Sequence, residues 1–198
     1  MTFRQLRLGA GLAIAIAIAP VMAQAQPSAP EALGTSIAHK LFSTMDLKAV
    51  IQNAMTASGE SLKVFTNIRP AWGQMAVDTL SDEFVADQPQ IEAVMGHKLV
   101  TQFSIDELQA GDLIMGDPGV QAQIAAAISH TQPGPPHFAP QTLRAMQSPA
   151  GRSFMSKVSN FQGLMGQDTT NEMMAIVIPG WLQRFGQKAA EGERARAH

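Results

Sequence analysis

Apolar residues recur at intervals of three and four along almost the whole chain after residue 30, a spacing that places them on one face of an α-helix. Leu33, Ile37 and Leu41 form one such stripe, and another extends from Ile91 to Phe103. No stretch alternates convincingly between apolar and polar residues, so no sheet is expected. The sequence therefore predicts an all-α, single-domain, irregular helical bundle of about eight to nine helices.

Prolines and glycines indicate where these helices end or bend. A break is expected near residues 44–46, and Pro70 with Gly73 should kink or divide the helix that contains them. The pair at 179–180, Pro-Gly, should bend or interrupt the last helix. The proline-rich stretch near residues 131–141 is expected to be an irregular connection.

Two segments in the second half of the chain, residues 103–119 and 148–152, contain residues typical of helix starts. In the first segment, Glu107 follows Ser104 by three residues. This spacing predicts a capping box, in which each side chain binds the other residue's free backbone N–H. The helix that starts there should end near Gly116. Asp117 and Pro118 should begin the next helix, with Asp117 as N-cap and Pro118 at the first position, where a missing N–H has no cost.

The second segment repeats the arrangement of Asp117 and Pro118, with Ser148 as N-cap and Pro149 at the first helical position. Thr169 and Glu172 form a further capping box ahead of the last apolar stripe. These patterns predict structural roles at helix starts for Ser104, Glu107, Asp117, Pro118, Ser148, Pro149 and Gly151.

The first 25 residues have the pattern of a secretory signal peptide. Two arginines precede the apolar stretch from Leu8 to Ala19, and small residues follow it, with cleavage expected after Ala23 or Ala25. The stretch is short for a membrane span, which needs about 20 residues, and an uncleaved anchor is the alternative interpretation. We therefore expect a periplasmic protein with its helical domain at 26–190 and a flexible C-terminal tail at 191–198.

Composition excludes several functional classes. The sequence contains no cysteine, so it forms no disulfide and carries no lipid-anchored cysteine. Loss of the signal peptide leaves 12 basic against 16 acidic side chains, a net charge of about −4, which argues against nucleic-acid binding. The one basic group lies near the C-terminus and is interpreted as favourable charge at a helix end; it consists of Arg184, Lys188, Arg194 and Arg196.

A longer pattern extends over residues 100–160 and includes both segments. It consists of a phenylalanine, a serine, a Glu-Leu pair, an apolar pair and a helix start with proline. Its first half consists of Phe103, Ser104, Glu107, Leu108, Ile114, Met115 and Pro118. Its second half consists of Leu143 and the Ser-Pro-Ala-Gly-Arg run at 148–152. The pattern resembles exported bacterial proteins catalogued as domain of unknown function twenty fifty-nine. This resemblance implies an exported, all-helical domain and supplies no activity or catalytic residues.

Residues able to carry chemistry are present but scattered. Ser148 lacks the G-x-S-x-G turn of a nucleophile, so an N-cap is the favoured interpretation. None of the five histidines has metal-ligand spacing. His130 and His137 bracket a loop, where two solvated histidines are favoured and metal binding is the alternative. The histidines are His39, His97, His130, His137 and His198.

Acidic residues and methionines form two further groups. A solvated helix face is the favoured interpretation of the acidic group, and a pair of catalytic carboxylates is the alternative. The methionines lie at stripe positions, which favours core packing over ligation of monovalent copper. No metal or cofactor is assigned. The acidic residues are Asp78, Asp82, Glu83, Asp87 and Glu92. The methionines of the helical region are Met45, Met55, Met75, Met95, Met115, Met146, Met155, Met165, Met173 and Met174.

The functional hypothesis is an adaptable apolar groove. A methionine-rich bundle that carries Trp72 and Trp181 beside its proline kinks is expected to accept an apolar peptide, a lipid-like ligand or another envelope protein. Simple core packing of both indoles is the alternative. The expected function is thus non-enzymatic binding or interaction in the cell envelope.

The hypothesis from a different class is a periplasmic enzyme whose active site is assembled from dispersed acidic and histidine residues. His97, Asp106 and Glu107 are the candidate cluster. Such a cluster depends on tertiary contacts, so the sequence supplies the residues without joining them.

Overall fold

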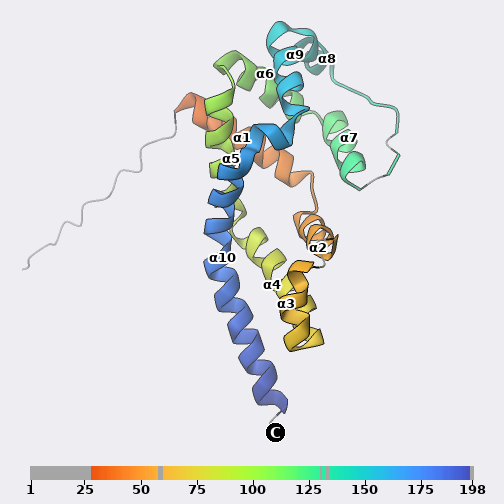
Figure 1. Ribbon diagram of the computed structural model, residues 1–198. Coiled ribbons are helices and arrows are strands. Elements are labelled where there is room, and N and C mark those ends of the chain that lie inside the picture. Colours follow the sequence, from red (N-terminus) through yellow and green to blue (C-terminus); the bar gives the residue numbers. More distant parts are fainter. Residues whose placement is uncertain (1–27, 58–59, 130, 133, 197–198) are drawn as a thin grey trace, which may run out of the picture.

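The structure is a computed structural model that describes residues 28–57, 60–129, 131–132 and 134–196, and this part of the chain forms ten α-helices and no strand (Figure 1). The predicted all-α bundle is confirmed, while the predicted signal peptide lies outside the described residues. The helices are α1 (Ala29–Ser43), α2 (Leu47–Ala57), α3 (Glu60–Ile68), α4 (Pro70–Ala86), α5 (Gln88–Gln102), α6 (Ile105–Met115), α7 (Pro118–Ile128), α8 (Pro140–Gln147), α9 (Pro149–Val158) and α10 (Phe161–Arg196).

The helices form two regions joined by α10. The upper region of Figure 1 contains α1, α5 to α9 and the first part of α10, with α1 against α5 and α6 and with α8 and α9 against α6. The lower region contains α2, α3, α4 and the rest of α10, in which α4 packs against the other three helices. Because α10 also packs against α5, it holds the two regions together.

The contact between α1 and α5 depends on two glycines that face each other. A side chain on Gly34 would collide with the backbone oxygen of Gly96, and a Cβ on Gly96 would lie 2.7 Å from the backbone nitrogen of Thr35. The two backbones therefore touch, which excludes any larger residue at either position. This close approach brings buried side chains such as Ile37 and Met95 into one core.

The predicted helix starts are confirmed in atomic detail at α6. The Ser104 hydroxyl accepts a hydrogen bond from the Glu107 N–H at 3.3 Å, and the Ser104 N–H donates to the Glu107 carboxylate at 2.7 Å. Gly116 is the C-cap of this helix, as expected. The capping box thus satisfies backbone groups that would otherwise lack partners.

The starts of α7 and α9 also agree with the sequence. Asp117 is the N-cap of α7 with Pro118 in its first turn, and Ser148 is the N-cap of α9 with Pro149 in the same place. The Ser148 hydroxyl accepts from the Gly151 N–H at 2.9 Å. A side chain at Gly151 would collide with the backbone oxygen of Ala145, so this glycine permits the sharp turn between α8 and α9.

The first half of the chain also divides near the expected places. The break near residues 44–46 separates α1 from α2, and the helix expected around Pro70 is divided there, since Pro70 begins α4. Gly73 lies inside α4 with its position buried. The connection at 131–139 is irregular, but α8 begins at Pro140 and was not foreseen as a separate helix, which brings the number of helices in the described residues to ten.

The last helix departs from the prediction. The backbone bends at Gly166, with φ 65° and ψ 169°, whereas Pro179 lies inside α10. The capping box expected at Thr169 and Glu172 is wrong because both residues follow that bend and lie within the helix. Helix α10 continues to Arg196, so most of the expected tail is helical. None of the helices in the described ranges has the length and apolar character needed to cross a membrane.

Candidate functional site: a methionine-lined cavity

A cavity of about 950 Å³ is lined mainly by helices of the upper region, including α1, α7, α9 and the first part of α10, while α2 and α4 of the lower region contribute Leu47 and Phe84. Its size is within the range of small-molecule binding sites. Aliphatic and aromatic side chains from six helices and the 131–139 connection form most of its wall. They include Leu41, Phe42, Leu47, Phe84, Ile91, Val120, Ile124, Ile128, Phe138 and Val158.

Methionine is the most frequent residue in the wall. Helices distant in sequence contribute one or two methionines each, and three of these, Met95, Met115 and Met165, are buried in the core. Because the unbranched thioether side chain has several rotatable bonds, such a wall adapts to different shapes. The cavity methionines are Met45, Met95, Met115, Met146, Met155, Met165 and Met173.

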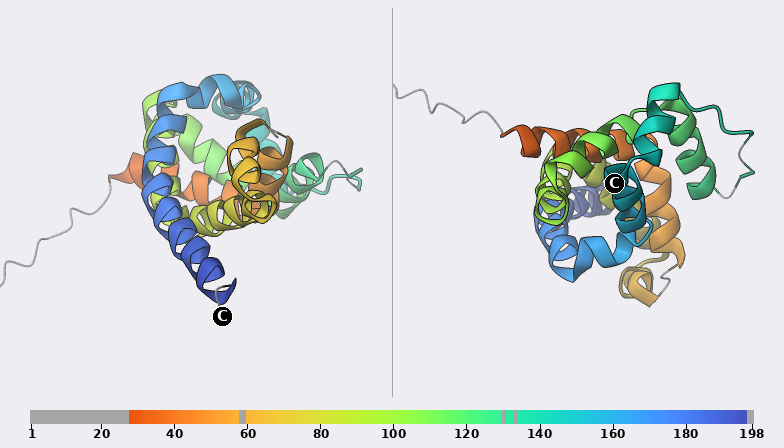
Figure 2. Two further views of the ribbon diagram at one scale, coloured as in Figure 1. Left: turned by 60° about the horizontal axis from the view of Figure 1, so that its bottom comes forward. Right: turned by 90° about the horizontal axis from the view of Figure 1, so that it is seen from above.

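Helix α7 forms one side of the cavity and is anchored mainly at its ends. It packs against α6 and turns an apolar face, including Val120, Ile124 and Ile128, toward the cavity. Figure 2 shows that α7 and the connection after it stand at the edge of the molecule. This side of the cavity therefore depends on few helix contacts.

Asp117 provides the anchor at the start of α7. Its buried carboxylate accepts hydrogen bonds from the Gly119 N–H at 2.8 Å, the Ala139 N–H at 2.9 Å and the Thr142 hydroxyl at 2.6 Å. The bonds from Thr142 and Ala139 hold the pKa of Asp117 below its ordinary value of 3.8. One carboxylate thus caps α7 and ties it to the start of α8.

Gly166 shapes the opposite side of the cavity. Its positive φ with ψ near 180° is a backbone conformation that is essentially restricted to glycine. The bend lies between Met165 and Gln167, and all three residues line the cavity. The chain can therefore turn around the end of the cavity before α10 continues toward the lower region (Figure 1).

None of the described residues that line the cavity is charged. Three side chains, Gln123, Gln167 and Thr170, are polar, and we call them the polar rim. Gln167 and Thr170 are exposed and Gln123 is half-buried. The arrangement can hold an apolar molecule by burial of its surface and offers a few hydrogen-bond partners where that molecule reaches solvent.

The two tryptophans lie elsewhere and do not line this cavity. Trp181 packs edge-on against Phe65 at 5.8 Å between ring centroids, and Trp72 does so against Phe185 at the same distance. The Trp181 indole N–H donates to the backbone oxygen of Ala76 at 3.1 Å. Both indoles pack against Phe185 in the space between α3, α4 and α10, which agrees with core packing, and a groove at the tryptophans stays a prediction.

The candidate catalytic cluster is not assembled. Glu107 binds the Lys157 ammonium at 2.8 Å and also accepts from the Ser153 hydroxyl. His97 and Asp106 are exposed, and no hydrogen bond or ion pair within the described ranges joins either of them to Glu107. Burial raises the pKa of Glu107, but the bonds from Lys157, Ser153 and the backbone outweigh it and lower the value to about 2. Glu107 therefore serves as a tie between α6 and α9.

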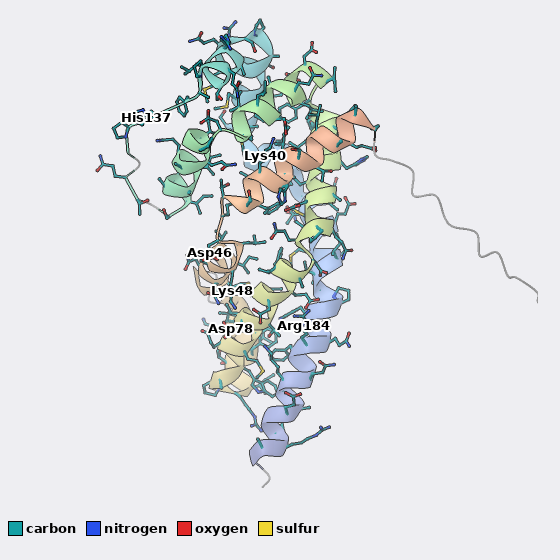
Figure 3. The ribbon with its side chains drawn as sticks, turned by 180° about the vertical axis from the view of Figure 1, so that it is seen from behind. Lys40, Asp46, Lys48, Asp78, His137 and Arg184 are labelled. Carbon is teal, nitrogen blue, oxygen red and sulfur yellow. The ribbon has the colours of Figure 1, made fainter. Side chains whose placement is uncertain are left out.

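The other acidic candidates are also held by partners. Asp82 binds Lys48 at 2.8 Å, and Glu83 binds Arg184 at 2.6 Å. The Lys48 hydrogen bond lowers the pKa of Asp82. Figure 3 shows Lys48 and Asp78 beside each other on the lower region, with Arg184 on α10. These contacts form ion pairs between helices. Because Glu83 and Glu92 are buried, the expected solvated helix face is wrong for these two residues.

The histidines provide no metal centre in the part of the chain that the structure describes. No group of three metal-ligating side chains occurs there. His39 contacts Glu92 at 3.1 Å, and His137 lies in the outer connection, where Figure 3 shows it away from the bundle. His130 and His198 lie outside the described residues, so the suggested pairing of His130 with His137 stays a prediction.

Comparison with protein-family models, with curated proteins and with solved structures gives no match. The resemblance to the exported bacterial family therefore stays a prediction. What the residues define is a class of site, an uncharged apolar cavity inside a helical bundle. Sequence reasoning identified the methionines but not their shared location, because they approach one another only through tertiary packing.

Proposed function

We propose that this protein is an exported, non-enzymatic binding protein of the cell envelope, and that its cavity holds the apolar chain of a lipid-like ligand. The observation that carries the proposal is the 950 Å³ cavity lined by seven methionines and no charged residue among those described. Thioether walls adapt to flexible apolar molecules. Export itself rests on the signal-peptide pattern of the first 25 residues.

The volume supports a lipid-like chain. A methylene group takes about the volume of a water molecule, about 30 Å³, so roughly 20 to 30 carbon atoms would fill the cavity. Burial of that much apolar surface supplies the main favourable term for binding. The polar rim leaves one end of the chain near solvent.

A peptide suits the cavity less well. A helix with its side chains fills roughly 140 Å³ per residue, so about seven residues, or two turns, would occupy the space. Helices that short are marginally stable alone. An extended peptide would place backbone N–H and C=O groups among thioethers that cannot satisfy them.

Native mass spectrometry tests the proposal on protein exported to a bacterial periplasm and purified without denaturant. We expect extra mass that is lost on denaturation, and lipid extraction should recover an apolar molecule. Ile124→Trp should fill the cavity from α7 and abolish the extra mass, since Ile124 lines it. The matched control is Ile178→Trp on α10, where the side chain is 37% exposed and lies outside the cavity.

Ligand-free protein supplies the second measurement. A ligand that binds only the folded state raises the unfolding midpoint according to its concentration and affinity. Dodecan-1-ol should therefore raise the midpoint of the wild type and of Ile178→Trp, but not that of Ile124→Trp. A clean monomer mass together with unchanged midpoints for all three proteins would rule out the binding function.

A further inference from the structure

We infer that the ligand has a polar end that donates a hydrogen bond and carries no negative charge, as in a long-chain alcohol, and that the cavity rejects fatty-acid anions. The inference rests on the proposed function and specifies the ligand class of the same cavity. Three features carry it: the lysines that neighbour lining residues in the chain are already paired, acidic residues beside lining residues form no ion pair among the described residues, and the rim presents unoccupied acceptor oxygens.

The lysines that neighbour lining residues in the chain are occupied by carboxylates. Lys40, beside Leu41, binds Asp112 at 2.5 Å and also donates to the Asp112 backbone oxygen at 3.0 Å. Figure 3 shows Lys40 on α1, within the upper region. A ligand anion would have to compete with an ion pair that is already formed and about three-quarters buried.

The same holds for the two other lysines in this position. Lys48, beside Leu47, binds Asp82 at 2.8 Å. Lys157, beside Val158, binds the buried Glu107 carboxylate at 2.8 Å. Breaking the Lys157 pair would leave Glu107 charged and buried, which is strongly unfavourable. The cavity therefore offers no free lysine to a carboxylate among these neighbours.

Three acidic residues that neighbour lining residues in the chain, Asp46, Asp168 and Glu172, form no ion pair among the described residues, although the Lys48 charge interacts with Asp46. Asp46 lies between Met45 and Leu47, and its carboxylate accepts only the Ala49 N–H, at 3.0 Å. Asp168 directly follows Gln167. Figure 3 shows Asp46 where α1 gives way to α2. An anionic head near these carboxylates would meet like charge, whereas a neutral head would not.

The polar rim presents acceptors. The Gln123 amide N–H donates to the backbone oxygen of Gly134 at 3.1 Å, and the Gln167 amide N–H donates to Asn171 at 2.9 Å. The side-chain oxygens of both glutamines accept no hydrogen bond from the described residues. A hydroxyl group can donate to such an oxygen, whereas an ionised carboxylate could use only the remaining N–H of each amide.

Matched ligands with one chain and three head groups test the inference. The assay measures how well dodecan-1-ol, dodecanoate and dodecylammonium each displace Nile red, a neutral probe, from the exported protein. It is run at pH 8 and below the aggregation limit of each ligand. We expect the alcohol to bind at least about tenfold more tightly than dodecanoate, a difference of about 1.4 kcal/mol. Dodecylammonium, which donates hydrogen bonds and is attracted by the neighbouring carboxylates, should likewise bind more tightly than dodecanoate.

A charge introduced at the rim provides the second test. Gln167→Lys should narrow the preference for alcohol over dodecanoate by about fivefold, and added salt should restore it. Gln183→Lys makes the same change at an exposed position of α10 that does not line the cavity, and should leave the preference unchanged.

The outcomes separate the two proposals. Binding of dodecanoate as tight as that of the alcohol, or tighter than that of dodecylammonium, would overturn the inference, while the binding function would stand. An equal effect of both lysine variants would also overturn it, because the rim would then have no special role. Failure of all three ligands to displace the probe, with no bound mass in native spectrometry, would overturn the binding function itself.

Discussion

Where α3 and α4 meet α10, aromatic rings fill the space between the helices, whereas the helices of the upper region surround a cavity. Phe65 and Phe185 lie 5.2 Å apart between centroids, and both tryptophans pack against Phe185. The upper region instead directs flexible thioethers at a space of about 950 Å³. Rigid rings suit a closed contact between helices, and methionines suit a wall that adjusts to a guest.

The two regions also differ in how their helices are tied together. Around the cavity, the buried carboxylates of Glu107 and Asp117 join α6 to α9 and α7 to α8. The lower region has the ring cluster and half-exposed ion pairs such as Lys48 with Asp82. Exposed pairs contribute little to stability, so the rings are expected to dominate there. The carboxylates compensate for the packing that the cavity lacks.

Trp181→Ala should have the largest effect, a loss of about 3 kcal/mol in the free energy of unfolding, because it removes a ring from a filled cluster and an indole hydrogen bond. Met173→Ala should cost only about 1 kcal/mol, since Met173 is half-buried and already borders empty space. Urea unfolding of ligand-free protein measures both. Equal losses would show that the two regions are packed alike.

As the pH is lowered, the upper region should lose stability at a higher pH than the lower region. The folded-state pKa of Glu107 is about 2 against an ordinary 4.5, and that of Asp117 lies below 3.8. A depressed carboxyl pKa stabilises the fold above the ordinary value, and this stability is lost as the pH falls from about 4.5 toward 2. Asp82 in the lower region is also depressed, but its side chain is 36% exposed and its contribution is screened.

The two regions have separate reporters for this titration. Methyl signals of the cavity methionines report on the upper region, and fluorescence of the two tryptophans reports on the lower region. The methionine signals should change at a higher pH than the fluorescence. Glu107→Gln should reduce the stability at pH 7 and flatten the dependence below pH 4.5. Coincident transitions of both reporters in the wild type would contradict the difference between the regions.

Helix starts could be predicted because their contacts are local. The capping box of Ser104 and Glu107 spans three residues, and so does the bond between Ser148 and Gly151. The prediction from local spacing failed at the start of α10, where the backbone bends before the expected capping box. Thr169 and Glu172 have capping-box spacing, but the bend occurs earlier, at Gly166, and nothing distinguishes this glycine in sequence from the other 15.

The cavity could not be predicted because its parts meet only in three dimensions. Stripe positions revealed that the methionines face inward, but not that seven of them surround one space. The bond from Lys157 to Glu107 and the contact of Gly34 with Gly96 likewise join distant helices. The ring contacts of the tryptophans could not be predicted either, because Phe65 and Phe185 reach them from distant segments of the chain.

Alanine substitutions at two glycines of α10 compare the bend beside the cavity with a regular helical position beyond it. Gly166→Ala should cost about 1 to 3 kcal/mol because alanine strains the backbone at φ 65°, although no atom blocks its side chain. Gly186→Ala, at an unobstructed helical position beyond the cavity, should instead stabilise the protein by about 0.5 to 1 kcal/mol. Thermal unfolding compares them, and a stabilising Gly166→Ala would place the bend elsewhere.

Ser148→Ala is expected to cost about 0.5 to 2 kcal/mol in the free energy of unfolding, because the Gly151 N–H then loses its side-chain acceptor. Ser156→Ala is the matched control: Ser156 is exposed within the same helix, and alanine there should be neutral or slightly stabilising. Thermal midpoints measured at pH 7 distinguish the two variants. If Ser148→Ala leaves the midpoint unchanged, α9 does not begin at Pro149, and the turn that brings Met146 and Met155 to the cavity must be formed by other residues.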